Sequence, residues 1–211
     1  MAEFINKISI YDQLSFIVVG GIFYAFLGYD LLYFGLELKK LLDNILEVGV
    51  AIYFLGHVAQ AIANVFIKEK KEAFPASQEK ILDKVKQHFC VPNYNYYEAF
   101  GLCYLWAIGA DKTGHVAEMN AKYGLYRGWF VVLSLQSVFY VGILIYELLI
   151  FQYHASCQFS KAYFIGMLFT IPLSVLMLNR SRRFFKLTGE KTLQTFLISN
   201  IPTEEKTNLN P

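Results

Sequence analysis

The chain has 211 residues, of which 55% are hydrophobic and 17% charged, whereas about 25% charged residues are typical of a soluble domain. Its formal net charge of +2 is too small to predict nucleic-acid binding from bulk electrostatics, so no direct nucleic-acid partner is expected. The charged residues gather between long windows that lack them, a distribution that favours an integral membrane protein over a soluble globule.

Four charge-free windows are long enough to cross a bilayer as helices. They contain 17 residues after Asp12, 20 after Glu47, 19 after Arg127 and 18 after Lys161. A helix needs about 20 apolar residues, at about 1.5 Å per residue, to cross the hydrocarbon core. The sequence therefore predicts an all-α fold: an integral membrane four-helix bundle with a helical cytoplasmic segment.

These windows divide the chain into four predicted parts. Residues 1–67 hold an amphipathic lead and two spanning helices, and residues 68–126 form the helical cytoplasmic segment. Residues 127–179 hold the other two spanning helices, and residues 180–211 form a cytoplasmic helix with a disordered tail. With both termini in the cytoplasm, 16 of the 19 lysines and arginines lie inside, as the positive-inside rule requires.

The cytoplasmic segment carries its own helix signals. Ser77 is the expected cap of a helix that Pro92 ends. The uncharged stretch Phe100–Ala110 is too short to span and predicts an interfacial or buried helix. Asp111 or Thr113 is expected to cap a further helix that runs with little break into the third spanning helix.

The second spanning helix carries a polar stripe, formed by Tyr53, His57, Gln60 and Asn64 at helical spacing. Polar side chains in hydrocarbon are costly unless they pair or meet water, so the stripe should face other helices or an aqueous cavity. Helix-to-helix hydrogen bonding is the favoured interpretation, and a pore or cavity lining is the alternative. Either interpretation predicts that the stripe does not face lipid.

The third and fourth spanning helices offer matching features. Ser137 and Tyr140 lie at helical spacing on the third helix and are further candidates for a cavity or pore lining. Gly166, Thr170 and Ser174 follow one another at four-residue steps on the fourth helix, a small-residue seam that allows a close neighbour. We expect the polar face of the third helix to meet the stripe in the core of the bundle.

Charges gather at both ends of the expected spans. Asp30, Glu47 and Glu147 predict an acidic outer mouth that attracts cations, although charges at helix ends are also common simply because they are hydrated there. Three arginines follow the fourth window and predict headgroup anchors or, less favoured, part of a phosphate site: Arg180, Arg182 and Arg183.

Enzymatic and metal-binding patterns were not found. There is no HExxH, no GxSxG and no glycine-rich phosphate loop, so we expect no enzyme, no catalytic residue and no cofactor. His154 and Cys157 have a metal-compatible spacing but lack two further ligands, so no metal site is expected. Cys90, Cys103 and Cys157 are expected to be free thiols, with an intermolecular Cys157 bridge as the alternative.

Four short motifs occur in order along nearly the whole chain: YDQLSFIVVGG from Tyr11, GHVAQAIAN from Gly56, NAKYGLYRGWF from Asn120 and NRSRRFFK from Asn179. In this the chain resembles the small four-helix membrane proteins of bacterial anti-phage defence operons. The resemblance implies a multi-pass protein of the bacterial inner membrane, either an oligomeric effector that permeabilises the membrane or a sensor that controls a cytoplasmic partner.

Three functions remain open from the sequence. The leading hypothesis is a homo-oligomeric, channel-like or membrane-disrupting effector, controlled from the cytoplasm by a protein or small signalling ligand of the same operon. A membrane sensor or anchor that binds and regulates a cytoplasmic protein is the alternative. A lipid-modifying enzyme that uses His57 with Glu47 or Glu147 has the poorest motif support.

Overall fold

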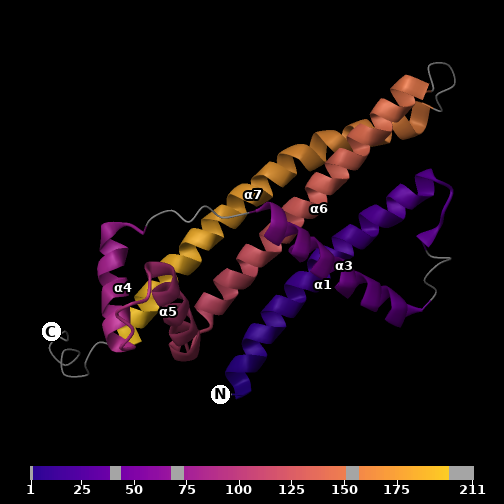
Figure 1. Cartoon of the computed structure of the whole chain (residues 1–211). Coiled ribbons are helices and arrows are strands. Elements are labelled where there is room, and N and C mark those ends of the chain that lie inside the picture. Colours follow the sequence, from indigo (N-terminus) through magenta and orange to yellow (C-terminus); the bar gives the residue numbers. More distant parts are fainter. Residues whose placement is uncertain (1, 39–43, 68–73, 151–156, 200–211) are drawn as a thin grey trace, which may run out of the picture. The chain divides into compact units, whose positions relative to one another are not determined.

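The computed structural model describes residues 2–38, 44–67, 74–150 and 157–199. In these ranges the chain forms helices and no strands, which confirms the predicted all-α class. The helices are α1 (Ala2–Tyr33), α3 (Ile45–Phe66), α4 (Ala76–His88), α5 (Tyr96–Ala110), α6 (His115–Ile150) and α7 (Cys157–Ser199) (Figure 1).

Four segments of these helices are long and apolar enough to cross a membrane. They are Gln13–Tyr33, Ile45–Phe66, His115–Leu149 and Lys161–Ser199. Each contains most or all of one charge-free window, so the predicted number of spanning helices is confirmed at the level of length and composition.

The described chain divides into two compact units. The bundle unit comprises residues 10–68 and 121–183, and the α4–α5 unit comprises residues 1–9, 69–120 and 184–211. The predicted cytoplasmic segment thus shares its unit with the C-terminal part of α7. Both α6 and α7 pass without a break from one unit into the other.

In the bundle unit, α1 and α3 cross with their backbones in contact (Figure 1). A Cβ atom added at Gly20 would lie 1.8 Å from the Ile52 carbonyl oxygen, and one at Gly56 would lie 2.1 Å from the Phe16 carbonyl oxygen. Any side chain larger than hydrogen would therefore separate the two helices. The sequence motifs that contain Gly20 and Gly56 meet at this crossing.

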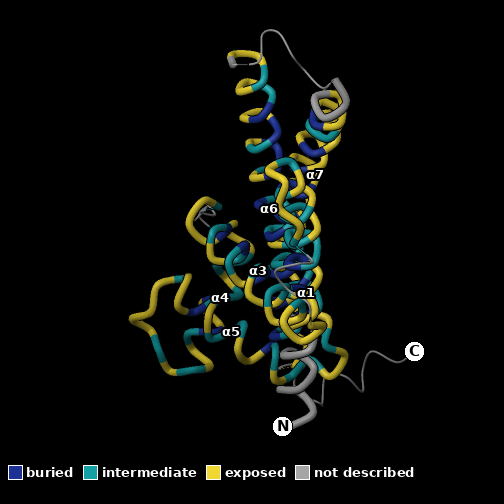
Figure 2. The backbone as a smooth tube through the Cα atoms, turned by 90° about the vertical axis from the view of Figure 1, so that its right-hand side faces the viewer, coloured by how far each residue is buried: buried dark blue, intermediate teal, exposed yellow. Residues whose placement is uncertain are grey.

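The predicted small-residue seam of α7 packs against α6. A Cβ atom added at Gly166 would lie 2.5 Å from the ring of Tyr140, so the missing side chain makes room for this ring. Thr170 and Ser174 are buried on the same face of α7. The buried and exposed stretches of α6 and α7 alternate along both helices, as expected of helices that bury one face (Figure 2).

The α4–α5 unit has an apolar core of its own. It is built by residues of α4, α5 and the end of α7: Leu82, Val85, Ala99, Cys103, Leu193 and Phe196. The Asn95 and Glu98 side chains form a capping box at the start of α5. α5 thus buries one face in this core, while Leu105 and Trp106 are exposed on the same helix.

Two helix boundaries in this unit differ from the sequence expectation. α4 begins at Ala76 behind Pro75, with no side-chain cap, so Ser77 lies inside the first turn rather than at the cap. A proline at the N-terminal edge starts a helix because its fixed φ suits it and its missing N–H needs no partner. The helix ends at His88, ahead of Pro92, where Cys90 takes a positive φ of 56°.

The two described thiols should differ sharply in reactivity. Cys90 is exposed, whereas Cys103 is buried and burial raises the pKa of its thiol to about 12. Because the thiolate is the reactive form, a maleimide added to the folded protein at neutral pH should modify Cys90 and spare Cys103. Peptide mass spectrometry with and without denaturant measures both sites, and equal modification of both in the folded protein would contradict the packing of α5.

The Asp111 carboxylate organises the start of α6. It accepts hydrogen bonds from the backbone N–H groups of Thr113, Gly114 and Val116 at 3.0, 3.1 and 2.8 Å. Of the two predicted caps, the structure selects Asp111. Partial burial alone would raise the pKa of this carboxyl, but the bonds from the Thr113 hydroxyl and from these three N–H groups outweigh it, so the pKa is lowered.

Replacing Asp111 by alanine should lower the free energy of unfolding by about 1 kcal/mol, as loss of a helix cap does. Because the folded pKa lies below the ordinary value of 3.8, the stabilisation is present above that pH and lost as pH falls through the folded pKa. Denaturant unfolding at neutral and acidic pH measures both effects. Lys112→Ala, at the exposed neighbour, is the control; equal effects of the two variants would contradict the capping role.

Candidate functional site in the bundle unit

The second half of the polar stripe, Gln60 and Asn64, joins α3 to α6 through hydrogen bonds. Gln60 Nε2 donates a hydrogen bond of 2.6 Å to the Gly124 carbonyl oxygen. The Arg127 guanidinium donates to Asn64 Oδ1 and, over 2.6 Å, to the Tyr123 hydroxyl, above whose ring it also lies at 5.0 Å. These are the helix-to-helix contacts that the favoured interpretation of the stripe describes.

The first half of the stripe has different neighbours. The His57 ring stacks on Phe16 of α1 at 4.0 Å between centroids and meets the Tyr53 ring edge-on at 4.5 Å. Both His57 and Tyr53 remain exposed at the surface of the bundle unit. The stripe is therefore divided: Gln60 and Asn64 reach α6, whereas the two rings lie beside α1 and keep one side open.

The polar residues predicted on α6 face α7. The Ser137 and Thr170 hydroxyl oxygens lie 2.9 Å apart, and the Ser137 hydroxyl also lies 2.7 Å from the Leu133 carbonyl oxygen. Tyr140 is 5% exposed and packs against Gly166. The structure therefore pairs this face with the seam of α7 and not with the stripe of α3, and the six lining candidates do not surround one common cavity.

A buried carboxylate lies between α1 and α6. Asp30 is 8% exposed, Gln136 is 4% exposed, and each Asp30 carboxylate oxygen lies 2.8 Å from Gln136 Nε2. The Tyr163 ring of α7 lies close by and contacts the rings of Tyr29, Tyr33 and Tyr140 at 5.7, 5.5 and 5.3 Å. An acid, an amide and four phenols from three helices thus gather in one part of the bundle unit.

The predicted acidic mouth is not assembled in the way its sequence positions indicated. The Asp30 carboxylate points inward at Gln136, while Glu47 is exposed on α3. Glu147 is half-buried and hydrogen-bonds the Tyr33 side chain. Asp30 was expected at the outer mouth, but α1 turns this side chain toward α6. The number of charges in one window does not predict how two helices pack, so the sequence did not indicate this contact.

The arginines after the fourth window do not act as a single cluster in the structure. Arg180 donates a hydrogen bond of 3.2 Å to the Tyr126 hydroxyl of α6 and lies 5.6 Å from the centroid of that ring. Arg182 and Arg183 are exposed, as headgroup anchors would be. Arg127 and Arg180 therefore both bind tyrosines of α6, and neither contact was foreseen from the sequence.

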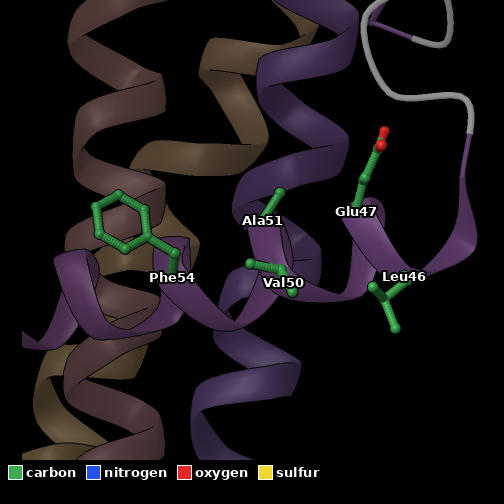
Figure 3. Close-up of a pocket in the computed structure, with 5 residues that line it drawn as sticks. All are labelled: Leu46, Glu47, Val50, Ala51 and Phe54. Carbon is green, nitrogen blue, oxygen red and sulfur yellow. The ribbon is translucent and has the colours of Figure 1, made fainter.

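A shallow hollow lies on the first half of α3. It is lined by Leu46, Glu47, Val50, Ala51 and Phe54, all from this one helix (Figure 3). Its lining is apolar apart from Glu47 and includes neither ring of the stripe. The hollow therefore offers no pair of groups suited to catalysis.

Metal-ligand groups are not clustered in the part of the chain that the structure describes. No set of three or more histidine, cysteine, aspartate or glutamate side chains could hold a metal ion among these residues. His154 and the Cys157 side chain lie outside the described residues, as does the predicted disordered tail.

Comparison of the chain with family models, curated proteins and solved structures finds no match. The candidate site is therefore interpreted from its own geometry.

Proposed function

We propose that the chain is an oligomeric inner-membrane protein, a channel-like or membrane-disrupting effector that the α4–α5 unit controls. The observation that supports control is the continuity of two helices. α6 contributes residues 115–120 to the α4–α5 unit and 121–150 to the bundle unit, while α7 contributes 157–183 to the bundle unit and 184–199 to the other. A change of packing in one unit can pass to the other through two helical backbones.

The proposal requires several copies of the chain. Four helices are too few to enclose a generous aqueous path, and polar groups such as Gln60, Asn64 and Ser137 already take part in contacts between helices. His57 and Tyr53, however, are exposed near the middle of a helix long enough to span. Polar rings at that depth favour contact with water or with another copy over contact with lipid.

The proposed cellular role is antiviral defence in bacteria, as the four sequence motifs imply by resemblance. A cytoplasmic protein or small signalling ligand of the same operon would then bind the α4–α5 unit, with both termini in the cytoplasm. No nucleic-acid partner is proposed, because the formal net charge is only +2.

Bacteria that express the chain with its neighbouring genes, challenged with phage and followed with a membrane-potential dye, provide the test. With the wild-type chain, we expect the infected cells to depolarise and the culture as a whole to survive the phage. Lys186→Pro should abolish the response, because proline removes a backbone hydrogen bond of α7 and clashes with the preceding turn. Lys186→Ala, at the same exposed position, should respond like the wild type.

A membrane potential that stays intact in protected cells would contradict the effector role. A Lys186→Pro variant that is folded and responds normally would contradict control through α7. Circular dichroism of the purified variants in lipid distinguishes a lost response from a lost fold.

The alternative, a membrane anchor that regulates a cytoplasmic protein, is favoured by a different observation. Tyr94, Tyr97, Leu105 and Trp106 are between 37% and 67% exposed on the α4–α5 unit. Exposed aromatic and aliphatic side chains are typical anchors of protein interfaces. Stable co-purification of a neighbouring gene product, lost in Leu105→Asp and without depolarisation in infected cells, would favour the anchor over the effector.

A lipid-modifying enzyme is the least supported proposal. His57 and Glu47 are ten residues apart on the same helix, which separates their Cα atoms by roughly 15 Å at about 1.5 Å per residue. A general base and its orienting acid must lie within hydrogen-bond reach, so this pair does not suit acid–base catalysis.

A further inference from the structure

The contact between Asp30 and Gln136 is unusual because the acid is buried with a neutral partner. Asp30 is 8% exposed, and the amide nitrogen of Gln136 supplies the contacts of 2.8 Å to both of its oxygens. An ionised carboxylate can accept about four hydrogen bonds and carries a full charge. One amide group neutralises none of that charge.

The position of Gln136 along α6 places this contact far from either end of the charge-free window. Gln136 lies nine residues after Arg127 and eleven before Glu147, hence roughly 13 Å and 16 Å from them along the axis at about 1.5 Å per residue. On α1, Asp30 itself closes the charge-free window and lies three residues before the helix end at Tyr33, so the contact joins the middle of the α6 window to the end of the α1 window.

The groups that face Asp30 are neutral on each helix packed around it. They are Gln136 and Tyr140 of α6 and Tyr163 of α7, and the Tyr163 ring in turn contacts Tyr29 and Tyr33 of α1. In the described chain, Asp30 makes no ion pair with a lysine, arginine or histidine within 4.0 Å. Glu147, the next acid along α6, hydrogen-bonds Tyr33.

An unpaired carboxylate buried among neutral groups between helices of this apolar character is costly. The cost is removed when the group takes up a positive charge. We propose that Asp30 and Gln136 form a buried cation-binding site whose resident cation is a proton.

A proton fits the site better than a metal ion does. Hard metal cations need several oxygen ligands arranged around them, and the described residues here supply a single carboxylate. A protonated carboxyl needs only one acceptor and one donor. In the structure Gln136 Nε2 lies 2.8 Å from both carboxyl oxygens, and a rotation of the amide about its last bond brings its oxygen to the carboxyl, where it can accept the O–H.

Occupancy of the site controls how α1 and α6 pack. With the proton bound, a neutral acid and an amide join the two helices; after its release, a charge remains that must draw in water or move toward it. Because the folded chain then holds a proton that the unfolded chain loses at neutral pH, stability must fall as pH rises through the titration of the site. This inference stands on the Asp30 contact alone and does not depend on the effector role.

The test uses the full chain in lipid nanodiscs and follows unfolding from mildly acidic to alkaline pH. We expect the unfolding equilibrium constant to rise up to tenfold per pH unit within the titration range, the limit for one proton. Asp30→Asn keeps the shape and one acceptor oxygen without the titration, so this dependence should disappear. Glu47→Gln, at an exposed carboxylate, should leave it unchanged.

A second measurement does not require a variant to fold. The infrared spectrum of folded wild-type protein at neutral pH should contain a protonated-carboxyl band that shifts when aspartate is isotopically labelled. Absence of this band would overturn the proposal, and so would an Asp30→Asn variant with the pH dependence of the wild type. A stability that follows sodium or potassium concentration at constant pH would also overturn it, by assigning the site to a metal cation.

Discussion

Alanine at Gly20 or Gly56 is expected to break the contact between α1 and α3. The added Cβ atom would lie 1.8 Å from the Ile52 carbonyl oxygen at Gly20 and 2.1 Å from the Phe16 carbonyl oxygen at Gly56, both of them backbone atoms. Backbone cannot move aside as a side chain can, so the cost should reach the upper end of overpacking, about 3 kcal/mol for each variant. Thermal unfolding in lipid nanodiscs measures the loss.

Two neighbouring glycines provide matched controls for this prediction. A Cβ atom at Gly21 of α1 or at Gly49 of α3 meets no atom within 4 Å. Alanine at these positions should leave stability unchanged or raise it, since alanine is the better helix former by about 1 kcal/mol. If Gly20→Ala and Gly21→Ala behaved alike, the close crossing of α1 and α3 would be wrong.

Truncation of Phe196 to alanine should be the most damaging single change in the α4–α5 unit. Phe196 is 2% exposed, and its ring lies 5.6 Å from His88 and 6.4 Å from Phe89 at the end of α4. Loss of a buried phenylalanine costs about 3–5 kcal/mol, because a cavity is added to the lost transfer free energy. The exchange rate of backbone amide hydrogens should then increase across α4 and α5.

Ile198→Ala, two residues further along α7, is the matched control because Ile198 is 63% exposed. Its exchange pattern should equal that of the wild type. Unchanged protection of α4 in Phe196→Ala would mean that the end of α7 does not complete the core of this unit, and the proposed path of control through α7 would lose its basis.

The spanning helices could be predicted from the sequence because hydrocarbon excludes charge so strongly. The four windows bounded by charged residues correspond to the four helices long and apolar enough to span. The length of α7 was underestimated, since the sequence was divided at Arg180 into a spanning helix and a separate final helix. α7 runs unbroken past Arg180, because no glycine or proline occurs in residues 173–188, and it continues through Gly189 to Ser199.

The candidate site could be predicted only in part, because helical spacing assigns residues to a face but not to a partner. The stripe from Tyr53 to Asn64 shares one face of α3, yet that face borders both α1 and α6 and is divided between them. The partner of Asp30 lies 106 residues away on α6. Nothing local to Asp30 indicates Gln136, so its buried position emerged only from the packing.

We propose that the chain spans the membrane with the α4–α5 unit in the cytoplasm, and thiol labelling tests this topology. Two single-cysteine variants are compared in cells whose outer membrane is permeable: one keeps only Cys90 of the α4–α5 unit, and the other carries only Glu37→Cys, in the turn after α1. With this topology, a membrane-impermeant maleimide should label the Glu37→Cys variant in intact cells and label Cys90 only after lysis. Labelling of Cys90 in intact cells, or of neither site until lysis, would contradict it.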